Sequence, residues 1–162
     1  WYNSFLLPAI LSYKMEILRL KQKLNCKRDD FQFTVSMKTR WRDLDAFQHV
    51  NNAVYATYIE NARATLFNRW SIRHDGKGKS LILVSIKIDY LKQLIHPTKF
   101  DVCQRISRIG STSFDLESAL FNNESDTPIC TSIATCVCFD FTKEKPVPVF
   151  KAIIDDFNDY KN

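Results

Sequence analysis

The chain has 162 residues, of which 45% are hydrophobic and 13% aromatic, enough apolar surface for one domain with a buried core. Its formal net charge of +5 is unevenly spread: residues 1–42 carry nine Lys or Arg against three Asp or Glu, and the remainder carries 14 against 15. Because the body is nearly neutral and has no stripe of cations interleaved with aromatics, the charge does not indicate a nucleic-acid-binding face.

Five cysteines lie in the sequence without any CxxC pair, mostly inside apolar runs. An odd number without such spacing indicates reduced thiols, and therefore a reducing compartment such as the cytoplasm. Cys136 and Cys138 are separated by one residue, and neither a histidine cluster nor a second cysteine pair completes a tetrahedral site. The sequence thus predicts no metal and no cofactor.

The first segments in chain order are an apolar stretch and a basic helix. The sequence begins at Trp1, and two interpretations of residues 1–14 stay open, the end of a targeting segment and an extension upstream of a start at Met15. Residues 9–24 place apolar side chains at helical spacing with Lys and Arg opposite. We expect this helix to pack on the domain or on a partner subunit, with membrane contact the less favoured alternative. Residues 1–28 are accordingly assigned to an N-terminal extension and residues 29–162 to the domain.

A strand and a long helix follow. Residues 31–41 alternate between apolar and polar side chains, which predicts a half-buried strand with Trp41 on its apolar side. The next regular segment starts at Asn52, a residue type that can cap free backbone N–H groups. The spacing of the apolar residues beyond it predicts a helix of about five turns with one buried face. These residues are Tyr55, Tyr58, Ile59, Ala62, Leu66, Phe67 and Trp70.

Four β-rich runs come next, at residues 81–91, 98–109, 112–121 and 128–141. Turn residues at 109–111 and 122–126 are few enough to form antiparallel hairpins. A short helix from about Val149 to Phe157 ends the chain. One strand, a long helix and a four-strand meander predict an α+β fold in which a curved antiparallel sheet covers one buried helix.

Polar and ionisable residues concentrate where the first strand joins the long helix. The run is Arg42-Asp43-Leu44-Asp45-Ala46-Phe47-Gln48-His49-Val50-Asn51-Asn52-Ala53-Val54-Tyr55. Desolvation between a strand and an apolar helix can raise the pKa of a carboxylate and sharpen its reactivity. The free N–H groups at a helix start can stabilise an oxyanion that forms on a bound carbonyl group, by ~3 kcal/mol for a well-placed donor.

Residues 43–63, DLDAFQHVNNAVYATYIENAR, resemble the signature of the 4-hydroxybenzoyl-CoA thioesterase-like branch of the hotdog-fold acyl-CoA thioesterases. The pattern of that branch is Asp-x-Asp-x-x-(Gly/Gln)-His-Val-Asn-Asn-x-x-Tyr followed by Glu-x-x-Arg. Residues 88–92 resemble its second strand, and residues 108–114 its third-to-fourth-strand turn. The resemblance spans roughly residues 33–150 and implies a hotdog fold, a curved antiparallel sheet of about five strands around one long helix. To this we add the N-terminal helical segment.

The resemblance implies hydrolysis of an acyl-CoA or related acyl thioester. Asp45 matches the catalytic carboxylate, which acts either as nucleophile or as general base on water. The backbone N–H near Asn52 matches the donor that polarises the substrate carbonyl. His49 and Asn51 match positions that line or brace the site, and Tyr55 lies one turn along the helix.

Further substrate contacts are expected outside this core. Phe47 is expected to line the acyl pocket, and Lys92, Arg105 and Arg108 are candidate cations for the phosphates of CoA. The family forms dimers, often dimers of dimers, with sites at subunit contacts. The resemblance therefore implies a homodimer or homotetramer whose ligand is an acyl-CoA.

Structural alternatives stand beside these roles. Asp43 is expected to bind Arg40, Arg42 or a backbone group rather than to catalyse. Glu60 and Arg63 are expected to form a buried or subunit-bridging contact. The two asparagines at the helix start are equally explained as caps, and the histidine of the segment as a hydrogen-bonded structural residue.

Two alternative functions stay open. Plant-type acyl-carrier-protein thioesterases share Gln-His-Val-Asn-Asn but carry an Asn two residues after the Asp, where this chain has Phe47, so their Asn-dependent mechanism does not carry over. A carrier-protein substrate nevertheless stays an alternative to CoA. The other alternative is a module that binds an acyl thioester without hydrolysing it, and the presence of Asp45 argues against it.

Overall fold

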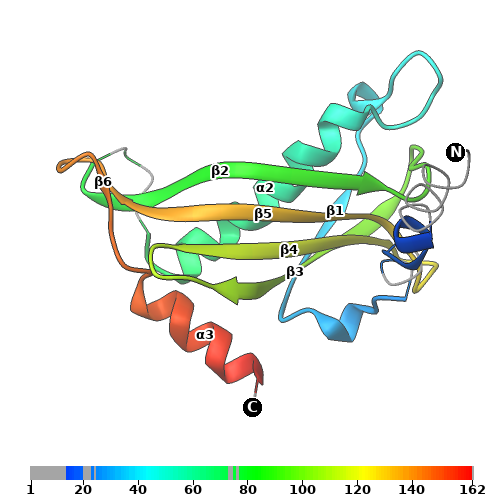
Figure 1. Ribbon diagram of the computed structural model, residues 1–162. Coiled ribbons are helices and arrows are strands. Elements are labelled where there is room, and N and C mark those ends of the chain that lie inside the picture. The colour runs from blue at the N-terminus through cyan, green and yellow to red at the C-terminus, as the bar shows by residue number, and fades with distance from the viewer. Residues whose placement is uncertain (1–13, 20–22, 24, 73–74, 76, 162) are drawn as a thin grey trace, which may run out of the picture.

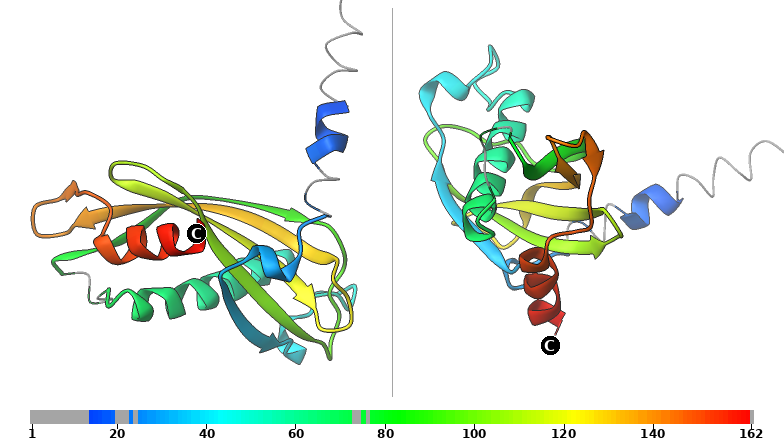
Figure 2. Two further views of the ribbon diagram at one scale, coloured as in Figure 1. Left: turned by 90° about the horizontal axis from the view of Figure 1, so that it is seen from below. Right: turned by 90° about the vertical axis from the view of Figure 1, so that its left-hand side faces the viewer.

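The computed structural model describes residues 14–19, 23, 25–72, 75 and 77–161. One antiparallel sheet has the strand order β1-β3-β4-β5-β2, and the short strand β6 pairs with β5. The sheet curls around the long helix α2 (Figures 1 and 2), so the predicted α+β architecture is confirmed. The elements are β1 (Phe33–Lys38), α2 (Asn52–Arg69), β2 (Lys79–Tyr90), β3 (Lys99–Ile109), β4 (Ser113–Asn122), β5 (Pro128–Asp140), β6 (Lys145–Pro146) and α3 (Lys151–Lys161).

Helix α2 has the predicted length and buried face. Its buried residues are Tyr55, Tyr58, Ile59, Ala62, Arg63 and Leu66, so only the arginine departs from the apolar stripe. Of the two asparagines predicted as possible caps, Asn51 is the cap of this helix. The side-chain oxygen of Asn51 accepts a hydrogen bond from the backbone N–H of Ala53 at 2.9 Å, and the helix begins with Asn52.

The first strand is shorter than predicted. Strand β1 ends at Lys38 because the chain turns into a 3₁₀ helix at Trp41–Asp43. Trp41 was predicted on the apolar side of the strand, and this is wrong: its side chain is 78% exposed. Within β1 itself, half-buried and exposed residues alternate as predicted.

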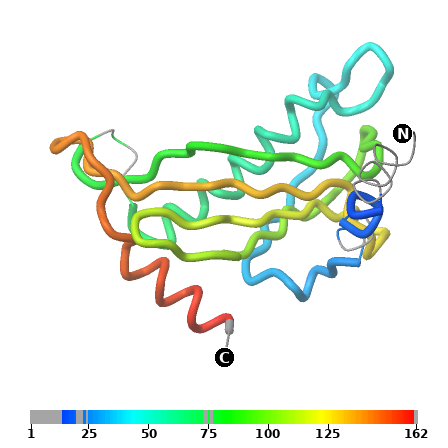
Figure 3. The backbone as a smooth tube through the Cα atoms, in the orientation of Figure 1, coloured from blue at the N-terminus to red at the C-terminus, as the bar shows by residue number. Residues whose placement is uncertain are grey.

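The predicted four-strand meander is wrong at its first strand. Strands β3, β4 and β5 do form consecutive antiparallel hairpins, but β2 pairs with β5 at the far edge of the sheet. The connection at residues 91–98 is too long for a tight hairpin, so local turn chemistry does not determine which strand β2 pairs with. This placement brings the end of β2 beside the start of α2 (Figure 3).

Helix α3 closes the other end of the core. The Asp156 carboxylate accepts hydrogen bonds from Arg69 Nε and Nη2 at 2.8 Å each and from Trp70 Nε1 at 2.7 Å. The bond from Arg69 holds the pKa of Asp156 below its ordinary value, although partial burial opposes this. The helix is thereby tied to the last turn of α2.

The convex face of the sheet carries the N-terminal segment. Residues 14–19 are helical, and the rest of the helix expected at 9–24 falls almost wholly outside the described residues. Lys23 forms an ion pair with Asp89, and the guanidinium of Arg28 lies 5.1 Å from the centre of the Phe121 ring. In the described part of the chain, no helix combines the length and the apolar composition needed to cross a membrane.

All five cysteines are free thiols, as predicted. Four are buried, and burial raises the pKa of the Cys130 thiol to about 12. Such thiols stay protonated near neutral pH and act as small apolar side chains.

Candidate active site

The segment between β1 and α2 forms a tight loop that closes on Asp45. The backbone N–H of Asp45 donates to the carbonyl of His49 at 2.8 Å, and that of Gln48 donates to the carbonyl of Asp45 at 3.1 Å. Asp45 Oδ1 accepts from the backbone N–H of Phe47 at 2.8 Å and of His49 at 3.3 Å. Its other oxygen, Oδ2, has no hydrogen-bond partner within the described part of the chain. One oxygen thus shapes the loop while the other keeps its acceptor capacity.

The start of α2 offers a free donor. The N–H of Asn51 donates to the carbonyl of Asp43 at 2.9 Å, and the N–H groups of Ala53 and Val54 bind the side chain and the carbonyl of Asn51. The N–H of Asn52 has no acceptor among the residues that the structure describes. Because the N-terminus of a helix carries partial positive charge, this N–H is suited to an oxyanion.

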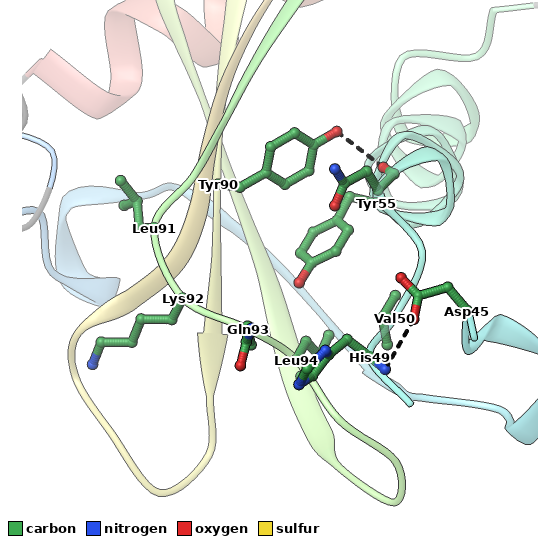
Figure 4. Close-up of a pocket in the computed structure, with 10 residues that line it drawn as sticks. Asp45, His49, Val50, Tyr55, Tyr90, Leu91, Lys92, Gln93 and Leu94 are labelled. Carbon is green, nitrogen blue, oxygen red and sulfur yellow. Dashed lines mark hydrogen bonds between the residues drawn. The ribbon is translucent and has the colours of Figure 1, made fainter. Parts of the chain in front are cut away.

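A cavity of about 340 Å³ lies between this helix start and the end of β2. Five of the nine predicted site residues line it: Asp45, His49, Asn52, Tyr55 and Lys92. In Figure 4, Asp45 and His49 lie together on one side, and the Lys92 side chain points away from Asp45. The remaining lining residues are Val50, Tyr90, Leu91, Gln93 and Leu94.

Four predicted substrate contacts do not line the cavity. The Phe47 side chain is 80% exposed, and that of Asn51 is engaged as the helix cap. Arg108 binds the carboxylate of Asp115, with 2.6 Å between Nε and Oδ2. Arg108 therefore does not line this cavity, and its assignment to the phosphates of CoA stays a prediction. Arg105 is likewise engaged, by Glu117.

Two lining residues with polar side chains, Gln93 and Tyr90, were not predicted from the sequence, and Tyr90 contacts helix α2. Its hydroxyl donates to the carbonyl of Asn52 at 3.0 Å, and its ring meets that of Tyr55 edge-on, with 5.1 Å between centroids. Burial raises the pKa of Tyr55 to about 12, so that hydroxyl also stays protonated. The one signal in the sequence that pointed to Tyr90 was the resemblance of residues 88–92 to a strand of the family. Without the β2–β5 pairing it did not place Tyr90 beside the helix.

Asp43 has the structural role expected of it. Its buried carboxylate accepts hydrogen bonds from Arg40 Nε at 3.0 Å and from the Tyr58 hydroxyl at 2.5 Å. Burial alone would raise its pKa, but the bonds from Arg40 and Tyr58 together outweigh burial and hold the pKa of Asp43 below the ordinary value. A carboxylate neutralised in this way is a poor nucleophile and a poor base.

Glu60 and Arg63 line a different hollow, between α2 and β2. The Arg63 side chain is 8% exposed and that of Glu60 68%, with 3.8 Å between Nη2 and Oε1. Arg63 Nη1 is buried and lacks a hydrogen-bond partner in the described chain. A buried guanidinium with so weak a partner is unfavourable in the isolated chain.

Metal ligands do not cluster at the site. Over the residues that the structure describes, no three His, Cys, Asp or Glu side chains are grouped so that they could hold an ion.

The sequence model of the thioesterase-like superfamily matches residues 39–157. The chloroplastic acyl-acyl carrier protein thioesterase ATL3 of Arabidopsis thaliana is 29% identical over 126 residues, which are 76% of this chain and 66% of that protein. The long-chain acyl-CoA thioesterase FadM of Escherichia coli is 25% identical over 114 residues, which are 67% of this chain and 84% of that protein. The chain spans 60–66% of the length of ATL3 and of two other relatives.

Solved structures share the architecture. A Thermus thermophilus thioesterase, crystallised with coenzyme A and Zn, has a TM-score of 0.69 at 26% identity, covering 82% of this chain and 96% of that chain. A Pseudomonas aeruginosa protein, PA5185, has a TM-score of 0.76 at 24% identity, covering 83% of this chain and 94% of that chain. These likenesses confirm the predicted hotdog fold. Since the family model extends over most of the chain, the protein belongs to the thioesterase-like superfamily.

Proposed function

We propose that this protein hydrolyses an acyl-CoA, or a related acyl thioester, to a carboxylic acid and a thiol, as a member of the 4-hydroxybenzoyl-CoA thioesterase-like branch. One observation carries the proposal: the Asp45 carboxylate and the first turn of α2 line the same cavity. A carboxylate with a free oxygen and a helix N–H with a free hydrogen are the two groups that acyl transfer requires.

The chemistry follows from these two groups. The thioester carbonyl oxygen accepts a hydrogen bond from the N–H of Asn52, which stabilises the negative charge that forms during attack. In one route Asp45 attacks the carbonyl carbon, the C–S bond breaks, the thiolate leaves and is protonated by water, and a second water hydrolyses the resulting anhydride. In the other route Asp45 removes a proton from the water that attacks the carbonyl. His49 braces the loop that presents the carboxylate.

The groups around the cavity support an acyl thioester as the substrate. Tyr55 and Tyr90 form an aromatic wall for the acyl group, and Lys92 supplies a cation at the rim for the thiol carrier. CoA is favoured by the likeness to FadM, whose substrate is named as a long-chain acyl-CoA. The likeness to ATL3, named as acting on an acyl carrier protein, supports that carrier as the second candidate.

A homodimer through the edge strand β2 is part of the proposal. Leu83, Val84 and Ile86 on this edge are 40%, 57% and 36% exposed, an unusual row of apolar side chains for a solvated strand. The hollow beside them holds the buried Nη1 group of Arg63, which has no hydrogen-bond partner among the described residues. A second copy related by a twofold axis covers the apolar row, and its Glu60 supplies the missing acceptor.

The test is a panel of acyl-CoA esters of graded chain length, followed by release of free thiol, with the Asp45→Asn variant alongside. We expect turnover by the natural chain, a large loss in the variant, and no effect of a chelator on either. Tight acyl-CoA binding without thiol release would favour the non-catalytic module. Turnover of the acyl-carrier-protein thioester alone would favour the second substrate.

A further inference from the structure

We propose that Tyr90 is a positioning residue for thioester hydrolysis: its hydroxyl holds the first turn of α2, and with it the N–H of Asn52, against the end of β2. This inference rests on the proposed function, because it concerns the placement of the group that meets the substrate carbonyl. It assigns to Tyr90 a role that acts through the helix backbone.

Tyr90 stands at a fixed point of the sheet. It is the last residue of β2 and lies opposite Cys130 of β5. Immediately after it, the N–H groups of Leu91 and Lys92 both donate to the carbonyl of Ile129, at 2.9 Å each, so the chain leaves the strand along a bonded path. The Tyr90 ring packs edge-on against Tyr55 at an interplanar angle of 83°. Backbone and ring together limit where the hydroxyl can point.

The Tyr90 hydroxyl contacts the first turn of α2, which is also bound to the loop that precedes the helix. On the loop side, the N–H of Asn51 donates to the carbonyl of Asp43 at 2.9 Å. On the sheet side, the Tyr90 hydroxyl donates to the carbonyl of Asn52 at 3.0 Å. Figure 4 shows Tyr90 and Asp45 facing the same cavity from different elements. The helix start is thus fixed between the loop that carries Asp45 and the strand that carries Tyr90.

The position of this turn matters because terminal helical turns lack their full set of hydrogen bonds and fray. Asn52 is exposed, and no packed side chain of its own holds it. An oxyanion donor acts only when it lies within hydrogen-bonding distance of the developing charge, and a displacement of about 1 Å can cost roughly a hundredfold in rate. Burial, and then the nearby Cys130 thiol, raise the pKa of Tyr90, so the hydroxyl keeps the proton that it donates across the neutral range.

The test is Tyr90→Phe in the full chain, which removes the hydroxyl and keeps the ring that packs on Tyr55. With the best acyl-CoA of the panel, we expect kcat to fall about tenfold, equivalent to about 1.4 kcal/mol, while KM stays within about twofold. Tyr160→Phe on α3 is the matched control, since it removes the hydroxyl of another partly exposed tyrosine, outside the cavity. Its kcat should equal that of the natural chain.

A second measurement follows the backbone amide of Asn52 by ¹⁵N NMR. In Tyr90→Phe the chemical shift of this amide should change, because the carbonyl of the same residue loses its donor, whereas in Tyr160→Phe it should not change. Both assays are run at a temperature at which circular dichroism shows each variant to be folded, so a lower melting temperature does not obscure the comparison. A merely structural tyrosine would lower the melting temperature and leave kcat unchanged.

The outcomes separate this inference from the function on which it rests. If the natural chain hydrolyses the thioester and Asp45→Asn does not, but Tyr90→Phe keeps its kcat within about twofold, the positioning role is refuted and the proposed function stands. A rise in KM with unchanged kcat would also refute it, because Tyr90 would then contribute to binding alone. If the natural chain releases no thiol, the proposed function itself fails.

Discussion

Replacing Asp45 by Asn removes a charge while leaving the loop that carries it. Asp45 Oδ1 accepts two backbone N–H groups, from Phe47 at 2.8 Å and His49 at 3.3 Å. The amide oxygen of an asparagine can accept both, so the closed loop persists with slightly weaker hydrogen bonds. We expect the free energy of unfolding to change by less than about 1 kcal/mol, a shift of no more than about 2–4 °C in Tm.

The chemical loss is much larger. Asp45→Asn exchanges the free carboxylate oxygen for an NH₂ group, which can neither attack a carbonyl nor accept a proton from water. The scale for a lost general base is about 10²–10⁴ in rate, or about 3–5 kcal/mol of transition-state stabilisation. The assay is thiol release at saturating acyl-CoA, with Tm measured on the same preparation. The expected signature is a collapse of kcat without a collapse of Tm.

Asp45→Ala separates the two roles of this side chain. It loses the charge and also both loop hydrogen bonds, so Tm should fall by a further amount equivalent to about 1–2 kcal/mol, while kcat falls at least as far as in Asp45→Asn. Near-normal kcat in Asp45→Asn on the best substrate would falsify the assignment. His49, which lines the same cavity, would then be the next candidate.

Asp43→Asn should show the reverse pattern, a Tm lowered by about 5–10 °C with kcat reduced far less. The reason is that the substitution weakens the hydrogen bonds of a buried carboxylate to Arg40 and Tyr58. A larger effect on kcat than on Tm would contradict the structural role of Asp43. Asp156→Asn should lower the free energy of unfolding by about 1–2 kcal/mol at neutral pH. Since the folded-state pKa of Asp156 lies below the ordinary 3.8, the stability that it adds is fully present above that value and is lost as pH falls through the folded-state pKa. Urea titrations of the natural chain and of Asp156→Asn should therefore give more similar free energies of unfolding near pH 3 than at pH 7. An equal difference in the free energy of unfolding at the two pH values would contradict this role of Asp156. Light scattering should give at least twice the 18.9 kDa chain mass, and Val84→Asp on the β2 edge should reduce it to one chain; a natural chain that is monomeric at micromolar concentration would refute the dimer.

The sequence predicted those features that repeat along the chain. The spacing of apolar residues from Tyr55 to Trp70 specifies one buried helix face, and the structure confirms it. The four β-rich runs were also located to within a few residues. Trp41 was misplaced because alternation alone does not reveal where a strand stops. Its neighbours turn into a 3₁₀ helix whose third residue, Asp43, binds back to Arg40.

The pairing of strands that lie far apart in the chain could not be predicted from the sequence pattern. The pairing of β2 with β5 depends on which edge of the sheet remains free once α2 occupies the concave face, and no turn residue encodes it. Tyr90 was missed for this reason, since its hydroxyl meets α2 only in that arrangement. Arg108 was included because a cation near a resembling turn suits a phosphate, yet Asp115 on the neighbouring strand β4 engages it. The resemblance located the catalytic segment, and the sheet topology determined what surrounds it.

The two aspartates of this segment show why one is a candidate catalyst and the other is not. They are of the same residue type and lie two positions apart. Both oxygens of Asp43 accept hydrogen bonds from the guanidinium of Arg40, and Oδ2 accepts a further one from the Tyr58 hydroxyl. Its charge and its acceptor sites are therefore used within the fold. Asp45 has no ion pair in the described part of the chain, and its two recorded hydrogen bonds fall on one oxygen, so the other can act on a substrate. Reactivity here follows from the acceptor capacity that folding leaves unused, and an arginine engineered to reach Asp45 should suppress turnover much as the loss of its charge does.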